Sequence, residues 1–153
     1  MISRRLVDQE GSSVVETALA AILVITIFFG IMETSLMLYD YHFISEAARE
    51  GTRYAIVHGS SCATTFTTAC PAASSDVQTY IKNLGFPGIV SADLTATTTW
   101  PTTGSACTPS ASPCNNPGNL VMVKVQYKLP LSIPFMSTQT FTMSSTSEMV
   151  ISQ

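Results

Sequence analysis

The sequence predicts an α+β protein in which one long N-terminal helix packs on a small antiparallel sheet. Three observations support this fold class. An uncharged apolar stretch of helical length lies near the start of the chain, and an apolar repeat with helical spacing continues beyond it to Val57. Beyond Val90, separate segments have apolar side chains at alternating positions, which is typical of strands with one buried face. A length of 153 residues fits one domain with an appended segment.

The apolar stretch is long enough for a membrane-spanning helix. Thr17–Met32 contains sixteen residues without a charge, and Ser12–Val15 and Leu36–Leu38 extend its apolar character on both sides. A helix needs about 17–25 such residues to cross a bilayer. A cleavable secretory signal would instead carry its small-residue cleavage site after the apolar stretch, but here Ala18-Leu19-Ala20 lies at the start. The order of these features therefore favours a spanning helix over a secretory signal.

Charge and cysteine content give the expected orientation. Arg4 and Arg5 precede the apolar stretch and favour a cytoplasmic N-terminus, so the rest of the chain would be extracytoplasmic. All four cysteines are in that part: Cys62, Cys70, Cys107 and Cys114. An even number of cysteines in an oxidising compartment indicates disulfides, for which three pairings are possible. The local pairing would close two short loops and contribute about 2–3 kcal/mol per bond. Without a Cys-x-x-Cys motif or a nearby histidine, we expect neither a metal nor a cofactor.

The helix is expected to continue beyond the membrane as an amphipathic segment. Its predicted apolar stripe consists of Leu36, Tyr39, Phe43, Ala47, Tyr54 and Val57. On the opposite face, Glu46 with Arg49 and Glu50 with Arg53 are three residues apart and can pair. Gly51 interrupts the run at a cost of about 1 kcal/mol relative to Ala. We expect one helix from Ser13 to Val57, ended by Gly59, with its stripe on the sheet.

The remaining chain predicts a short helix and three strands. The helix begins at Ser74 and ends at Gly85, with Val77 and Ile81 on its apolar face. Alternating side chains place the strands at Val90–Thr98, Val121–Leu129 and Gln139–Ser152.

Composition argues against two function classes. The seven Lys and Arg residues are scattered, so a nucleic-acid interface is not expected. After Glu50 the chain has only three acids, and it has neither a catalytic triad nor a glycine-rich phosphate loop, so an enzyme is not expected. A membrane-anchored binding module or adhesin remains open, with the Thr-rich strands and the loop Pro101–Gly118 as its recognition surface.

The N-terminal residues carry the main functional hypothesis. The segment MISRRLVDQEG ends in Gly11, and Glu16 follows five residues later within apolar surroundings. A charge in hydrocarbon costs about 2.5 kcal/mol or more. Cleavage after Gly11 would leave an ammonium on Ser12, which Glu16 of a neighbouring, staggered subunit could meet and thereby fix the register of an assembly. Alternatively, Glu16 simply suits the positive N-terminal end of a helix at a membrane interface.

This arrangement resembles the prepilin family, and a second motif resembles the TadE-like proteins of tight-adherence (Tad) pilus systems. The motif is Ala47-Ala48-Arg49-Glu50-Gly51-Thr52-Arg53-Tyr54-Ala55, and Gly30-Ile31-Met32-Glu33 is also similar to that family. In related chains an aromatic residue usually follows the Glu, whereas this chain has Thr17. The resemblance implies a pilin-like fold with a leader (1–11), a transmembrane helix (12–38) and an extracytoplasmic head (39–153).

The resemblance also implies a role and a set of partners. The role is that of a non-enzymatic minor pseudopilin in the bacterial inner membrane, which helps to initiate or assemble a pilus used for adhesion. Its partners would be a prepilin peptidase that cuts between Gly11 and Ser12, other pilin and pseudopilin subunits, the assembly platform in the membrane, and the lipid bilayer.

Overall fold

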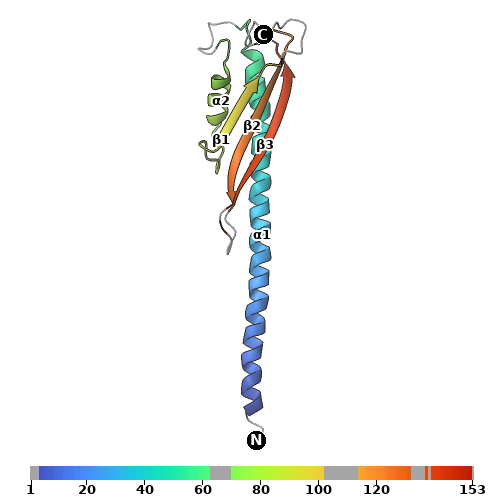
Figure 1. Ribbon diagram of the computed structural model, residues 1–153, viewed down its shortest axis with the longest axis vertical. Helices are drawn as coiled ribbons and strands as arrows, with labels where there is room; N and C mark the ends of the chain where they lie inside the picture. The colour runs from blue at the N-terminus through green and yellow to red at the C-terminus, as the bar shows by residue number, and fades with distance from the viewer. Residues whose placement is uncertain (1–3, 63–69, 102–113, 132–136, 138, 153) are drawn as a thin grey trace.

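A computed structural model describes residues 4–62, 70–101, 114–131, 137 and 139–152. The chain forms a helix α1 (Arg4–Val57), a short helix α2 (Ser74–Lys82) and three strands, β1 (Leu94–Thr99), β2 (Leu120–Leu131) and β3 (Gln139–Val150). Figure 1 shows that the N-terminal half of α1 stands alone, whereas its C-terminal half lies along the sheet. The predicted α+β class, with a long helix on a small antiparallel sheet, is confirmed.

Helix α1 ends at Val57, as predicted, but it begins at Arg4 rather than at Ser13. The described part of the predicted leader is therefore helical, and the helix passes through Gly11 and Ser12 without a break. The reason is that the segment before Ser13 contains no proline and mostly good helix formers, while one glycine costs only about 1 kcal/mol. Residues 1–3 of the leader are outside the described residues.

The three strands form an antiparallel sheet in the order β1-β2-β3. Val125 of β2 lies between Ala96 of β1 and Ser145 of β3, which fixes the register of both strand pairs. Strand β1 begins at Leu94 instead of Val90, because a turn at Val90–Asp93 precedes it. Strand β2 continues to Leu131, two residues beyond the predicted end at Leu129, and includes Pro130.

The short helix α2 begins at Ser74 as predicted, and its start is stabilised by Asp76, which accepts a hydrogen bond from the backbone N–H of Ala73 at 2.8 Å. It ends at Lys82, three residues before Gly85, whose φ of +65° suits a glycine. Its buried side chains are those of Val77 and Ile81, as expected from their spacing.

Both helices pack on one face of the sheet, with α1 along β2 and β3 and α2 beside β1 (Figure 1). The sheet contributes alternating inward side chains to the core: Leu94, Ala96, Val121, Val123, Val125, Tyr127 and Met143. Its other face is largely polar and exposed, with threonines, serines and lysines at the intervening positions. The alternation predicted from the sequence is therefore the alternation between core and solvent.

The buried face of α1 differs from the predicted stripe. Phe43 and Ala47 are buried as expected, but Leu36 and Val57 remain 48% and 44% exposed. The residues that face the sheet and α2 are mostly small: Asp40, Phe43, Ile44, Ala47, Ala48, Gly51, Thr52 and Ala55. The prediction assigned the buried face to the large apolar side chains, and it was wrong for Leu36 and Val57. A helix that lies close to a sheet needs small side chains at the contact.

Candidate functional site

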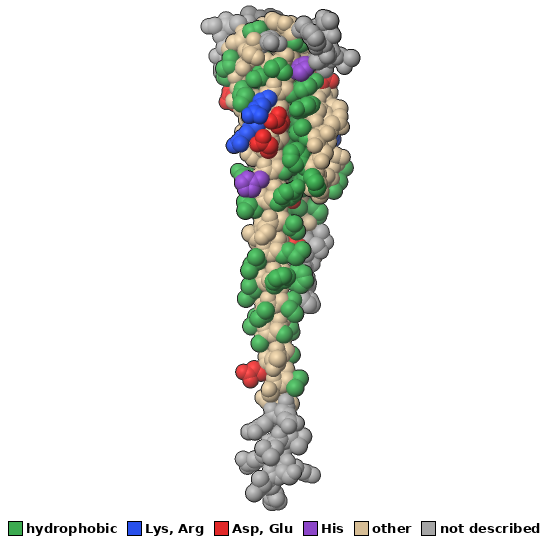
Figure 2. Space-filling model, turned by 180° about the vertical axis from the view of Figure 1, so that it is seen from behind, with side chains coloured by type: hydrophobic (Ala, Val, Ile, Leu, Met, Phe, Trp, Pro, Cys, Tyr) green, Lys and Arg blue, Asp and Glu red, His purple; other side chains and the backbone are tan. Residues whose placement is uncertain are grey.

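The N-terminal half of α1 presents a continuous apolar surface. Its large side chains from Val14 to Met32 are all strongly exposed, as in Leu23 at 66% and Phe28 at 66%. Figure 2 shows these hydrophobic side chains along the narrow stem below the head. The segment is long and apolar enough to cross a membrane, and none of it is buried inside the protein. Such a surface would be unfavourable in water, whereas a bilayer would cover it.

The proposed cleavage and pairing residues lie at the lower end of this surface. Ser12 and Glu16 are exposed and four residues apart on α1, so they lie on the same side of the helix about one turn apart. Among the described side chains, Glu16 forms no ion pair within the chain. A side chain at Gly11 would find no atom within 4 Å outside its local backbone. These residues are therefore accessible to another protein, and no described side chain of the same chain forms an ion pair with the Glu16 carboxylate.

The Ala-Ala-Arg-Glu-Gly motif lies where α1 packs against the head, and it divides into two faces. Ala47, Ala48 and Gly51 point inward and are buried. A Cβ atom placed on Gly51 would lie 2.5 Å from Ile81 Cδ1 of α2 and 3.2 Å from Val123 Cγ1 of β2. The missing side chain at Gly51 thus allows α1 to approach both elements closely.

The charged residues of the motif occupy the outer face. Arg49 pairs with Glu46 at 3.6 Å, and Arg53 pairs with Glu50 at 2.7 Å, in the two pairs that the spacing predicted. Figure 2 shows these basic and acidic side chains clustered on the surface of the head. Exposed pairs of this type contribute only about 0.3–0.5 kcal/mol each. Their contribution to the fold is therefore small, and their surface is free to contact another subunit.

Tyr54, which is also part of the motif, connects α1 to α2. Its ring stacks on Tyr80 with a centroid distance of 4.4 Å and on His58 at 4.0 Å. Burial raises the pKa of the Tyr54 phenol, and the Asp76 carboxylate and Tyr80 act in the same direction. The phenol therefore remains neutral at physiological pH, and Tyr54 has a packing role within the described residues.

One of the predicted disulfides is present in the described part of the chain. A bond joins Cys62 to Cys70, which belongs to the local pairing and excludes the two pairings that would separate these residues. Cys114 is buried at 4% exposure. Cys107 lies outside the described residues, as does most of the loop Pro101–Gly118, so the second bond of the local pairing remains a prediction.

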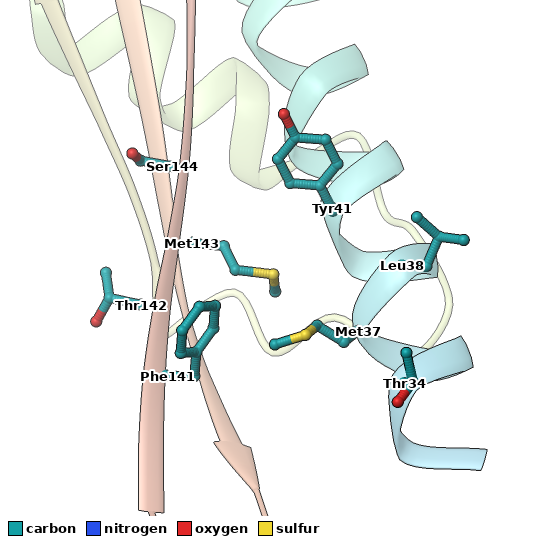
Figure 3. Close-up of a pocket in the computed structure, with 8 residues that line it drawn as sticks. All are labelled: Thr34, Met37, Leu38, Tyr41, Phe141, Thr142, Met143 and Ser144. Carbon is teal, nitrogen blue, oxygen red and sulfur yellow. The ribbon is translucent and has the colours of Figure 1, made fainter. Parts of the chain in front are cut away.

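A groove between α1 and β3 was not predicted from the sequence. It has a volume of about 560 Å³ and is lined by Thr34, Met37, Leu38, Tyr41, Phe141, Thr142, Met143 and Ser144. In Figure 3, Met37 on the helix and Phe141 and Met143 on the strand point toward one another across this space. The sequence placed Phe141 and Met143 on one face of a strand, but spacing alone could not indicate which part of α1 they meet.

Comparison with known proteins confirms the resemblance in the N-terminal part. Residues 11–53 match the model of the family described as TadE-like protein, a range that includes Gly11, Glu16 and the motif as far as Arg53. No curated protein and no solved structure matches the chain. The match covers less than a third of the chain, and it shows that these residues are similar to TadE-like proteins.

Proposed function

We propose that this chain, whose residues 11–53 match the TadE-like family, is a non-enzymatic minor pseudopilin of a Tad-type pilus used for adhesion. One observation carries the proposal. Helix α1 is unbroken from an exposed apolar half to a half that is packed in the head, and the family match covers the junction. A helix of this kind can hold a head at a membrane and also pack beside other such helices in an assembly.

The proposal divides the chain into three parts. Residues 1–11 form a leader that a prepilin peptidase removes, residues 12–38 cross the bacterial inner membrane, and residues 39–153 form the extracytoplasmic head. Cleavage in a helix requires local unwinding, and glycine is the weakest helix former apart from proline. Within the described residues that precede the apolar stretch, Gly11 is therefore the residue at which the helix opens at least cost.

Glu16 then has a role in assembly. After cleavage, Ser12 carries an ammonium, and Glu16 of a neighbouring subunit can accept a charge-assisted hydrogen bond from it. The exposure of Glu16 in the single chain supports a partner in another subunit. Because an unpaired charge in hydrocarbon is penalised, the pair favours one stagger between helices over the others. Pilin and pseudopilin subunits, with the assembly platform in the membrane, are the proposed partners.

The first test is the mature N-terminus. In membrane fractions of cells that express the native chain with its pilus system, we expect the N-terminal sequence to begin at Ser12. Gly11→Ala should cause the uncut form to accumulate and pilus assembly to fall. Gly30→Ala is the matched control, because it adds the same methyl group to a helical glycine that also has open space. A native chain that retains Met1 would favour a membrane-anchored binding module instead.

The second test concerns the charge pair. Glu16→Ala should leave the chain in the membrane while its co-purification with other pilus subunits falls. Breaking one side of a buried pair costs about 3 kcal/mol or more, which corresponds to roughly a 100-fold loss of affinity. Glu33→Ala is the control, since it removes the acid at the other end of the apolar stretch. Unchanged co-purification of the Glu16 variant would contradict the pairing.

A further inference from the structure

We propose that the groove between α1 and β3 holds an acyl chain of a phospholipid from the extracytoplasmic leaflet of the membrane. This inference rests on the spanning role proposed for α1 and extends it to the head. It assigns a lipid contact to Phe141 and Met143, which are more than a hundred residues from the spanning segment in the sequence.

The lining of the groove has the chemistry of a lipid contact. None of its eight described lining residues is charged, and its hydroxyl groups are those of Thr34, Tyr41, Thr142 and Ser144. In Figure 3 the Tyr41 hydroxyl points away from the spanning half of α1, while the thioethers of Met37 and Met143 lie inside the groove. Thioether side chains adapt to flexible apolar ligands. The groove is therefore apolar toward the membrane, with a phenolic hydroxyl at the end away from it.

Large apolar side chains around the groove are exposed in the isolated protein. Leu38 is 57% exposed, Tyr41 is 49% exposed and Phe141 is 46% exposed. Leu38 is the last residue of the proposed spanning segment and Tyr41 follows it on α1, whereas Phe141 comes from the head. Three such side chains around one groove indicate that something apolar covers them.

The depth of the groove in the membrane follows from helix geometry. A helix rises about 1.5 Å per residue, so a hydrocarbon core of about 30 Å takes up about 20 residues. Centred on residues 12–38, which cross the membrane in the proposal, this length runs from Val15 to Ser35 and keeps Glu16 just inside the hydrocarbon core. Thr34 and Met37 thus lie at the level where the acyl chains end, and Tyr41 lies among the headgroups. Tyrosine is enriched at this level in membrane proteins.

The groove is also continuous with the lipid-facing surface of α1. Thr34 and Leu38 line both this groove and a shallow groove of about 490 Å³ on α1, whose other lining residues include Ile27, Gly30 and Ile31. The surface that faces lipid tails therefore leads directly into the space between α1 and β3. This continuity favours an acyl chain of the surrounding bilayer over a separate protein partner as the occupant.

Tryptophan fluorescence tests the inference on the full chain in lipid nanodiscs that hold one copy each. The single native tryptophan is first replaced by Trp100→Phe, a change that removes no hydrogen bond, because the buried Trp100 Nε1 has no partner among the described residues. Phe141→Trp then reports on the groove. Its emission should be blue-shifted and should fall strongly when the phospholipids carry bromine on their acyl chains.

Two reference variants distinguish the possible outcomes. Ile25→Trp, in the spanning half, should be quenched if α1 crosses the bilayer, and Val150→Trp, at the far end of β3 and 56% exposed in its native form, should not be quenched. Quenching at position 25 without quenching at position 141 overturns the groove inference and leaves the spanning role intact. A lack of quenching at both positions overturns the spanning role and the groove inference with it. If quenching at position 141 appears only when a disc holds several copies, the groove inference is also overturned, and self-association of the chain is indicated instead.

Discussion

Gly51→Ala tests whether α1 is held in place by a close approach to α2 and β2. On its own, α1 would gain about 1 kcal/mol from this substitution, because alanine is the better helix former. The packed protein should nevertheless lose stability. The added Cβ would lie 2.5 Å from Ile81 Cδ1, 3.1 Å from Ile81 Cγ1 and 3.2 Å from Val123 Cγ1. Favourable carbon–carbon contacts are at about 3.5–4.0 Å.

The surroundings leave little room for relaxation. Ile81 is 1% exposed and Val123 is fully buried, so neither side chain can turn toward solvent. Overpacking of a core costs about 1–3 kcal/mol. Subtraction of the gain in helix propensity leaves a net loss of about 0–2 kcal/mol. Because the closest contact is only 2.5 Å, we expect the free energy of unfolding to fall by an amount in the upper half of that range, about 1–2 kcal/mol. For a head of this size, that loss lowers Tm by roughly 3–8 °C.

The assay is thermal unfolding of the full chain in detergent, followed by near-ultraviolet circular dichroism of the aromatic side chains in the head. Gly30→Ala is the control and should not lower Tm, since no atom lies within 4 Å of its added Cβ. Ile81→Val removes the atom of the closest contact. Combined with Gly51→Ala, it should give a loss that is smaller than the sum of the single losses by about 0.5 kcal/mol or more. An unchanged or higher Tm for Gly51→Ala, or strict additivity in the double variant, would refute the close-approach argument.

Three further predictions concern the head. Replacing both Cys62 and Cys70 by serine should lower the free energy of unfolding by about 2–3 kcal/mol in the chain-entropy model. Under reducing conditions the native chain also lacks this disulfide, so the double variant and the native chain should then be equally stable. Ile44→Ala, at a fully buried position on α1, should cost about 2–5 kcal/mol in the same thermal assay, whereas Ile44→Val should cost only about 0.5–1.5 kcal/mol. Arg53→Gln removes an exposed pair with Glu50 and should change stability by about 0.5 kcal/mol or less. A large fall in Tm for that variant would mean that the pair contributes more to the head than its exposure suggests.

The sequence determined the types of the elements and much of their extent. Period-two alternation identified all three strands, and the end of α1 at Val57 and the start of α2 at Ser74 were both predicted from local residues. These features depend on neighbours along the chain, which is the information that spacing and capping residues carry. The TadE-like resemblance of the N-terminal part was also recognisable, because its motif residues are contiguous.

The tertiary structure decided which face of α1 is buried. A prediction from hydrophobic spacing assigns the buried face to the large apolar side chains. The contact with the sheet instead uses Ala47, Ala48, Gly51 and Thr52, because backbones that approach closely leave no room for larger side chains. From the sequence alone, Gly51 was interpreted as an interruption of the helix. In the structure, the lack of a side chain at Gly51 makes room for Ile81 and Val123. In the same way, only the folded chain brings Phe141 and Met143 of β3 to Met37 of α1. Local spacing sets the face on which a residue lies, but the packing of distant elements decides what that face meets.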